Sequence, residues 1–275
     1  MIAASAGPDP GPGHPAGQTE NGEPVVLVER RGRVLLVTIN RPKQRNALDG
    51  AAGPALAAAM DTLDGDDGLS VGVLTGAGGT FSAGMDLKAF LRGERPDLPG
   101  RGLGGITQTP TRKPLVAAVE GWALAGGFEL LLACDLIVAA ETARFGVPEV
   151  KRGLVAGGGA ALKLPRRIPY AVALELLLIG DPISAHRGYE LGLVNRVVGE
   201  GQALAEALAL AELMVANGPL ALAATKEVAS QTMDWPADVA WPRQEQILAP
   251  VYASEDAREG ARAFAEKRPP AWTGR

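Results

Sequence analysis

The chain has 275 residues, of which 47% are hydrophobic and 21% charged, and its formal net charge is −4. This length and apolar content can fill one large hydrophobic core or two small ones, and the excess of acidic side chains leaves no basic field to attract nucleic acid or an anionic membrane. The single cysteine, Cys134, excludes a disulfide framework and favours a reducing, cytoplasmic setting.

The N-terminal residues 1–24 are rich in glycine and proline and contain neither a basic segment nor an apolar run. We therefore expect a disordered tail there rather than a signal sequence. Regular structure should begin at Val25. The segments "VVLVER" and "RVLLVTIN" have strand-like composition on either side of Arg31 and Gly32, a pattern that predicts a β-hairpin.

An amphipathic helix is predicted next, in "PALAAAMDTL", where Leu56, Met60 and Leu63 recur at helical spacing. Asn46 or Asp49 can cap this helix, because each side chain carries an oxygen that accepts hydrogen bonds from free backbone amides. The apolar run "LSVGVLTG" after the helix predicts a buried strand.

Strands and helices alternate through the middle of the chain. The segments "PLVAAVEG", "DLIVAA" and "ARFGV" predict strands, and "GGFELLLAC" predicts a helix. A short helix is expected from Lys88 to Leu91, and "GERPDLPGRGLGG" is typical of a mobile loop. From Ala160 onward the pattern is mostly helical, so the fold class is α/β at first and all-α at the end.

Glycine-rich turns follow several of the predicted strands, at "TGAGGTFSAGMDL", "VEGWALAGGFEL" and "GVPEVKRGLVAGGG". None of them matches a phosphate-binding fingerprint. A glycine turn that opens a helix leaves backbone amides free to hold an oxygen that gains negative charge. Glu129 and Glu149 lie within two of these turns, and a pair of carboxylates near such amides suits proton transfer beside a carbonyl group.

Five segments, in this order, resemble the crotonase superfamily of enoyl-CoA hydratases and isomerases: "NRPKQRNAL", "FSAGMDLK", "GWALAGGFELLLACD", "FGVPEVKRGL" and "GLVNRVV". The C-terminal "SEDAREGARAFAEKRPPAWTGR", with "GFEL" and "LPRRIP", also resembles the carnitinyl-CoA dehydratase branch. The resemblance implies a spiral of ββα units over residues 25–200. A helical trimerisation region over residues 201–275 should follow, with the protein assembled as a homotrimer or a dimer of trimers.

The resemblance also implies an oxyanion hole, in which the backbone amides of Met85 and Gly126 polarise the thioester carbonyl of an acyl-CoA substrate. Glu129 would orient and deprotonate a water molecule, and Glu149 would protonate C2, as in the hydration of a 2-enoyl-CoA. Coenzyme A is part of the substrate, and no separate cofactor is expected. No cluster of residues has metal-ligand spacing, and neither histidine stands in a nucleophile–base pattern.

Further positions match substrate-binding segments of the superfamily. Lys88 and Lys267 would meet the phosphates of coenzyme A, and Phe264 would pack beside the ligand. The loop that begins at Asn46 matches the one that accommodates the adenine. The full set of expected substrate contacts is Asn46, Ala47, Leu48, Ala83, Met85, Asp86, Leu87, Lys88, Gly126, Phe264 and Lys267.

Three residues depart from the pattern of simple hydratases, which often have Gly, Cys and Pro where this chain has Ala125, Phe128 and Ala156. The sequence therefore leaves the acyl group open, and a carnitinyl-CoA dehydratase or an enoyl-CoA isomerase remains an alternative activity. A non-catalytic acyl-CoA-binding or RNA-binding protein of the same fold is the alternative from another class. The negative net charge argues against RNA binding, and the two retained glutamates argue against lost catalysis.

Overall fold

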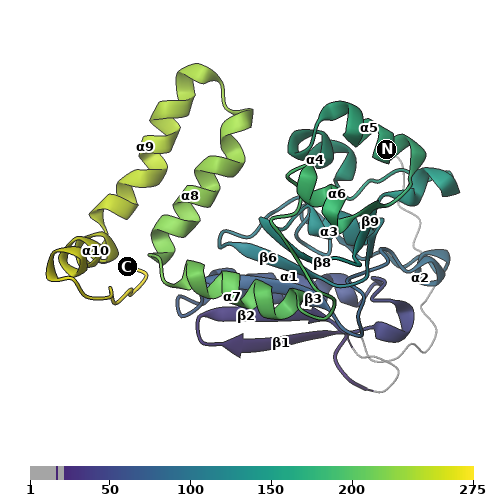
Figure 1. The fold of residues 1–275 in the computed structure, drawn as a ribbon, viewed down its shortest axis with the longest axis horizontal. Coiled ribbons are helices and arrows are strands. Elements are labelled where there is room, and N and C mark those ends of the chain that lie inside the picture. Colours follow the sequence, from purple (N-terminus) through teal and green to yellow (C-terminus); the bar gives the residue numbers. More distant parts are fainter. Residues whose placement is uncertain (1–16, 18–21) are drawn as a thin grey trace, which may run out of the picture.

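A six-stranded sheet forms the centre of the structure, a computed structural model that describes Gly17 and residues 22–275. Its strand order is β1-β2-β3-β6-β8-β11 (Figure 1). The first two strands form the predicted antiparallel hairpin, and each later strand runs parallel to its neighbour. The strands are β1 (Val26–Arg31), β2 (Val34–Ile39), β3 (Val71–Gly76), β6 (Leu115–Val119), β8 (Leu136–Ala140) and β11 (Arg196–Val198).

A second, three-stranded sheet lies beside the first and has the order β10-β9-β7. The chain alternates between the two sheets: β6 of the large sheet is followed by β7 of the small one and then α3, and β8 is followed by β9 and then α4. This is the ββα repeat expected of the spiral. The elements are β7 (Trp122–Leu124), β9 (Arg144–Gly146), β10 (Ile183–Ser184), α3 (Gly126–Leu131) and α4 (Ala160–Arg167).

The large sheet is buried on both faces. Alternate residues of β2 point to opposite sides, so Leu35 and Val37 join the main core while Val34 and Leu36 pack toward α7 (Ala203–Val215). The helix α7 covers the face that carries Val34, and α1 (Ala52–Gly65) covers the opposite face; Figure 1 shows α7 lying across the sheet. This two-sided burial explains why the parallel strands read as continuous apolar runs.

The last three helices, α8 (Pro219–Gln231), α9 (Ala237–Ala253) and α10 (Glu255–Glu266), form a C-terminal arm that projects from the sheets (Figure 1). No single helix among the described residues is long and apolar enough to span a membrane. The two segments α7 and Pro219–Asp234 together have sufficient length and apolar composition, but a bend of 107° separates them. The other helices are α1 (Ala52–Gly65), α2 (Leu87–Leu91), α5 (Tyr170–Ile179), α6 (Ala185–Glu190), and the 3-10 turns η1 (Pro42–Gln44), η2 (Pro148–Arg152) and η3 (Thr232–Asp234).

Most predicted elements are present, and three details differ. Asp49, not Asn46, caps α1, because its Oδ1 accepts from the amide of Ala52 at 3.0 Å. The segment expected to be a loop, residues 93–105, contains the hairpin of β4 (Asp97–Leu98) and β5 (Gly102–Leu103), and its second half is buried. The strands β7, β10 and β11 were not predicted. The expected tail, residues 1–24, lies outside the described residues except for Gly17 and residues 22–24.

Candidate active site

Two backbone amides lie close together where β7 leads into α3. A methyl group placed on Gly84 would lie 2.8 Å from the nitrogen of Gly126, and one placed on Gly126 would lie 3.5 Å from the nitrogen of Met85. Within the described part of the chain, neither the Met85 nor the Gly126 amide donates a hydrogen bond. Two free donors at this separation can hold a carbonyl oxygen that gains negative charge.

Strand-like pairing between two loops holds the Met85 amide in place. Leu48 donates from its amide to the carbonyl of Gly84 at 2.7 Å, and Asp86 donates to the carbonyl of Leu48 at 2.8 Å. The amide of Ala83 donates to the carbonyl of Arg45 at 3.0 Å. The predicted contact segments 46–48 and 83–88 are thus brought side by side.

A buried arginine ties the same two loops together. Arg41 forms ion pairs with Asp49 at 2.8 Å and with Asp86 at 3.2 Å, and it also donates to the carbonyl of Ala47. Asp86 caps α2 by accepting from the amides of Lys88 and Ala89. Burial raises the pKa of Asp86, but the bonds from Ala89 and Arg41 outweigh it and lower that pKa overall. Arg41 and Asp86 therefore hold the loops and are not free for a ligand.

Asn46 has a structural role. Its side chain is fully buried, and its Oδ1 accepts from the amide of Arg41 at 2.9 Å. Its Nδ2 donates to the carbonyls of Ala77 and Thr80 at 2.8 and 2.6 Å. The side-chain hydrogen bonds of Asn46 are thus used within the protein, and only its backbone remains to contact substrate.

Glu129 lies one turn into α3 and is only 4% exposed. The amide of Ala160 donates to its Oε1 at 3.1 Å. Burial raises the pKa of Glu129 to about 7; the Ala160 amide opposes this rise, and the negative charge of Glu149 adds to it. A carboxyl group with a pKa near 7 is well suited to exchange a proton at neutral pH.

The glycine run that precedes α4 supports this carboxylate. The amides of Gly158 and Gly159 also donate toward Glu129 and lower its pKa. A methyl group on Gly158 would lie 2.4 Å from Oε2 of Glu129, so the carboxylate needs glycine at this position. The contact of Gly158 to Ala160 with Glu129 was not predicted, although a glycine-rich turn that opens a helix indicates free amides in the sequence.

Glu149 belongs to the turn η2 and is half-buried. Burial raises the pKa of Glu149, while its own backbone amide and Arg152 oppose the rise. Among the described residues, no group forms a hydrogen bond to its buried Oε2 atom. Because the charge of Glu149 raises the pKa of Glu129, the two carboxyl groups lie within electrostatic reach of each other.

The raised pKa of Glu129 makes stability depend on pH. Below about pH 4.5 the carboxyl is protonated in both states, but between about 4.5 and 7 the unfolded chain releases a proton that the folded protein keeps. The free energy of unfolding should therefore fall as pH rises through this window. Glu129→Gln cannot ionise and should be more stable than the wild type at pH 8, by on the order of 1–3 kcal/mol.

Urea unfolding at pH 5 and pH 8 measures this effect. Glu245→Gln, on the exposed surface of α9, is the control and should follow the wild type. An identical loss of stability between the two pH values in Glu129→Gln and in the wild type would contradict the buried-charge explanation.

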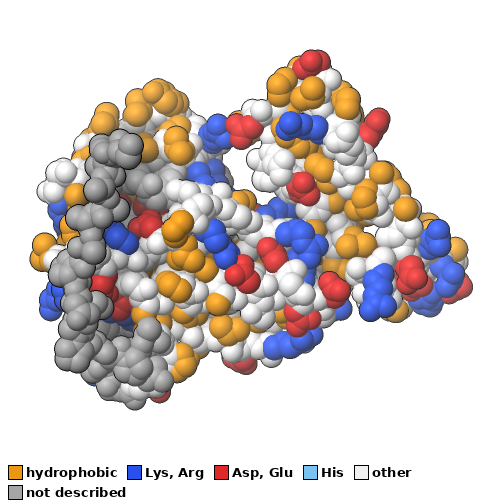
Figure 2. Space-filling view, turned by 180° about the vertical axis from the view of Figure 1, so that it is seen from behind, with side chains coloured by type: hydrophobic (Ala, Val, Ile, Leu, Met, Phe, Trp, Pro, Cys, Tyr) orange, Lys and Arg blue, Asp and Glu red, His pale blue; other side chains and the backbone are white. Residues whose placement is uncertain are grey.

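The two ends of the predicted coenzyme A site are not brought together within one chain. Lys88 is exposed on α2, beside the free amides. Phe264, which is 88% exposed, lies on α10 at the opposite end of the molecule (Figure 1), and Lys267 directly follows the last residue of that helix. Figure 2 shows further hydrophobic side chains on the surface of the C-terminal arm, where Met233 and Trp241 are more than 70% exposed.

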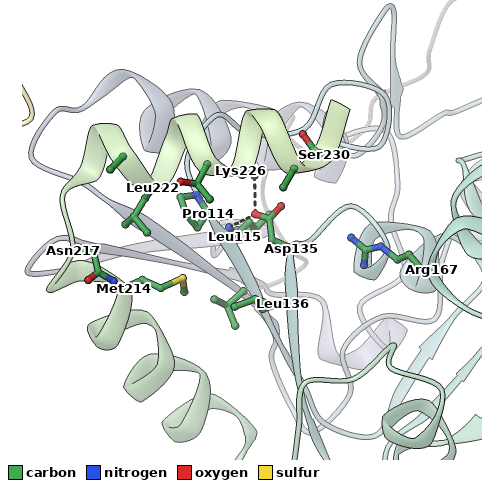
Figure 3. Close-up of a pocket in the computed structure, with 14 residues that line it drawn as sticks. Pro114, Leu115, Asp135, Leu136, Arg167, Met214, Asn217, Leu222, Lys226 and Ser230 are labelled. Carbon is green, nitrogen blue, oxygen red and sulfur yellow. Dashed lines mark hydrogen bonds and ion pairs between the residues drawn. The ribbon is translucent and has the colours of Figure 1, made fainter. Parts of the chain in front are cut away.

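A cavity of about 560 Å³ lies away from these groups, between α7, α8 and the first residues of β6 and β8 (Figure 3). Its lining includes none of the predicted site residues. Lys226 of α8 pairs with Asp135 there at 2.7 Å, and Arg167 donates to the carbonyl of Cys134 at 2.7 Å. The first contact anchors α8 and the second anchors α4 to the segment that precedes β8, and we assign no part of the chemistry to the cavity.

Comparison with known proteins connects this site to one family. The family model described as enoyl-CoA hydratase/isomerase matches residues 29–275. The enoyl-CoA hydratase EchA19 of Mycobacterium tuberculosis is 45% identical over 92% of this chain and 97% of its own length, and the carnitinyl-CoA dehydratase of Salmonella typhi is 42% identical over 90% and 97%. The crystal structure of enoyl-CoA hydratase EchA1 from Mycobacterium marinum superposes with a TM-score of 0.90, at 61% identity, over 92% of this chain and all of that one.

Proposed function

Because the chain belongs to the enoyl-CoA hydratase/isomerase family, we propose that it adds water reversibly across the 2,3 double bond of a 2-enoyl-CoA thioester. The observation that carries this proposal is the juxtaposition of two free amides, at Met85 and Gly126, with the buried carboxyl group of Glu129 and the half-buried one of Glu149. An isomerase of the same family can use one acid, whereas hydration needs a group for the water and a group for the proton that reaches C2.

The amides act on the thioester. When hydroxide adds at C3, negative charge moves to the thioester oxygen, and donors fixed in advance at Met85 and Gly126 stabilise it without having to reorganise. The Leu48–Gly84 and Asp86–Leu48 hydrogen bonds keep the Met85 amide in position during this step.

The carboxyl groups move the protons. Glu129 accepts a proton from water as the oxygen bonds to C3, and Glu149 delivers a proton to C2 of the enolate. A pKa near 7 for Glu129 lets it act as a base at neutral pH and still release the proton afterwards. No electron is transferred, so the proposed reaction requires no redox partner, and coenzyme A enters as part of the substrate.

We also propose that the protein works as a homotrimer or a dimer of trimers. The exposed apolar side chains of the C-terminal arm, among them Trp241, Tyr252 and Phe264, are candidates for burial against a neighbouring copy. Because α10 lies far from α2 within one chain (Figure 1), Phe264 and Lys267 can contribute to a coenzyme A site beside α2 only in such an assembly.

A panel of 2-enoyl-CoA esters tests the function, with loss of the enoyl-thioester absorbance as the measurement. Crotonyl-CoA should be hydrated. Crotonobetainyl-CoA belongs in the panel because a carnitinyl-CoA dehydratase is 42% identical to this chain. Preferential turnover of that ester would favour carnitinyl-CoA dehydratase activity over general enoyl-CoA hydration. Binding of several esters without turnover of any would favour a non-catalytic acyl-CoA-binding protein.

A further inference from the structure

The turn that follows β5 packs directly beneath the candidate active site. Residues 102–107 are all buried, although the composition of residues 93–105 is typical of a mobile loop. Leu103 is 4% exposed and donates from its amide to Oγ1 of Thr107 at 2.9 Å. This turn places a branched apolar side chain next to groups that the proposed reaction uses.

The side chain of Leu103 touches both halves of the site. Its Cδ2 would lie 2.8 Å from a methyl group placed on Gly126 and 3.2 Å from one placed on Gly158. Gly126 supplies an oxyanion amide, and Gly158 packs against the carboxylate of Glu129. In the proposed reaction the acyl carbons next to the thioester lie between the Gly126 amide and Glu129, and the Leu103 side chain packs against both of these groups.

We propose that Leu103 closes the acyl end of the site and restricts the enzyme to short 2-enoyl groups, with about four to six carbons. This inference rests on the proposed function, since the course of the acyl chain follows from carbonyl binding at Met85 and Gly126. The physical basis is volume: a close-packed branched side chain leaves no room for further methylene groups unless it moves.

The packing behind the turn prevents that movement. A methyl group on Gly104 would lie 2.8 Å from Cδ2 of Leu130 in α3, and one on Gly105 would lie 2.5 Å from Cβ of Ala57 in α1. Arg101 fixes the turn further, because it donates to the carbonyl of Gly105 at 3.1 Å and pairs with Asp61 of α1 at 2.9 Å. The turn is held between two helices, which restricts movement of the backbone that carries Leu103.

The test compares kcat/KM for 2-enoyl-CoA esters of four, six, eight and ten carbons. Wild-type kcat/KM should fall as the chain lengthens beyond six carbons. Leu103→Ala should raise the ratio of the eight-carbon to the four-carbon value roughly 10-fold or more, the scale on which an apolar pocket discriminates by size. Leu103→Val removes less volume and should raise the ratio by a smaller factor. It replaces the alanine variant in this test if Leu103→Ala does not fold.

Leu56→Ala is the matched control, because Leu56 lies against Gly104 of the turn and its atoms are not among the three nearest to a methyl group on Gly126 or Gly158. It should lose stability and keep the wild-type ratio. An equal wild-type kcat/KM at all four lengths, or an equal gain for long chains in Leu56→Ala, would overturn the role of Leu103.

A binding series of saturated acyl-CoA esters, measured by calorimetry, separates this inference from the proposed function. If no ester is hydrated but affinity still falls with chain length in the wild type and recovers in Leu103→Ala, the proposed function fails and the role of Leu103 stands. If esters of all lengths are hydrated equally well, the proposed function stands and the role of Leu103 fails.

Discussion

Glu129→Gln and Glu149→Gln should each lower kcat for hydration about 10²- to 10⁴-fold, the usual contribution of a positioned acid or base. Glutamine keeps the size of each side chain but can neither accept nor deliver the proton. Because both groups act on the same water and substrate, the double variant should be only slightly worse than either single one. Substrate affinity should survive, since the thioester is held by the amides of Met85 and Gly126.

Direct binding and single-turnover measurements on the three variants check this prediction. Glu141→Gln, exposed just beyond β8, is the control and should retain full activity. If Glu149→Gln hydrates the substrate at the wild-type rate, the two-acid mechanism is wrong for this protein, and single-acid isomerase chemistry centred on Glu129 becomes the better explanation.

Gly84→Ala should lower kcat about 10²- to 10³-fold, the effect of removing a donor from an oxyanion hole. Gly84 has a φ of 92°, and a methyl group there would lie 2.8 Å from the nitrogen of Gly126 and 2.8 Å from Cβ of Ala125. The added group would therefore enter the space between the two donors. The loss should appear mainly in kcat, because the charge on the thioester oxygen develops in the transition state.

Gly93→Ala separates this effect from backbone strain. Gly93 has a comparable φ of 85°, but nothing lies within 4 Å of a methyl group there. Gly93→Ala should lose stability on the order of 1 kcal/mol from strain alone, and Gly84→Ala should lose more because its methyl group also meets atoms closer than 3.0 Å. Only Gly84→Ala should lose activity and the shift in absorbance that a polarised thioester shows on binding. Full activity in Gly84→Ala would mean that the Met85 and Gly126 amides do not bind the carbonyl.

The sequence pattern was sufficient to predict those elements whose structure is decided by residues close together in the chain. The β1–β2 hairpin follows from two strand-like runs around Gly32, and the face of α1 follows from the spacing of Leu56, Met60 and Leu63, all of which are buried. The pair of glutamates and the glycine turns were likewise visible in the sequence. Short-range hydrogen bonding and hydrophobic periodicity act within a few residues, so the sequence reports them directly.

Contacts between distant segments were not visible in the sequence. Asn46 was a plausible cap for α1 and an expected substrate contact, yet the carbonyls of Ala77 and Thr80, more than thirty residues away, take its side chain. The turn around Leu103 has the composition of a loop and becomes buried because α1 and α3 close over it.

The sequence by itself therefore determined the fold class and the family, and it pointed to Glu129 and Glu149, because these depend on local patterns and motifs. Only the tertiary structure decided the surroundings of Glu129. The glycine run at Gly158 and Gly159 meets Glu129 from a different ββα unit, and burial in that contact raises the pKa of Glu129 to about 7. Desolvation is a property of the assembled interior, to which segments far apart in the chain contribute, so no single stretch of sequence encodes it.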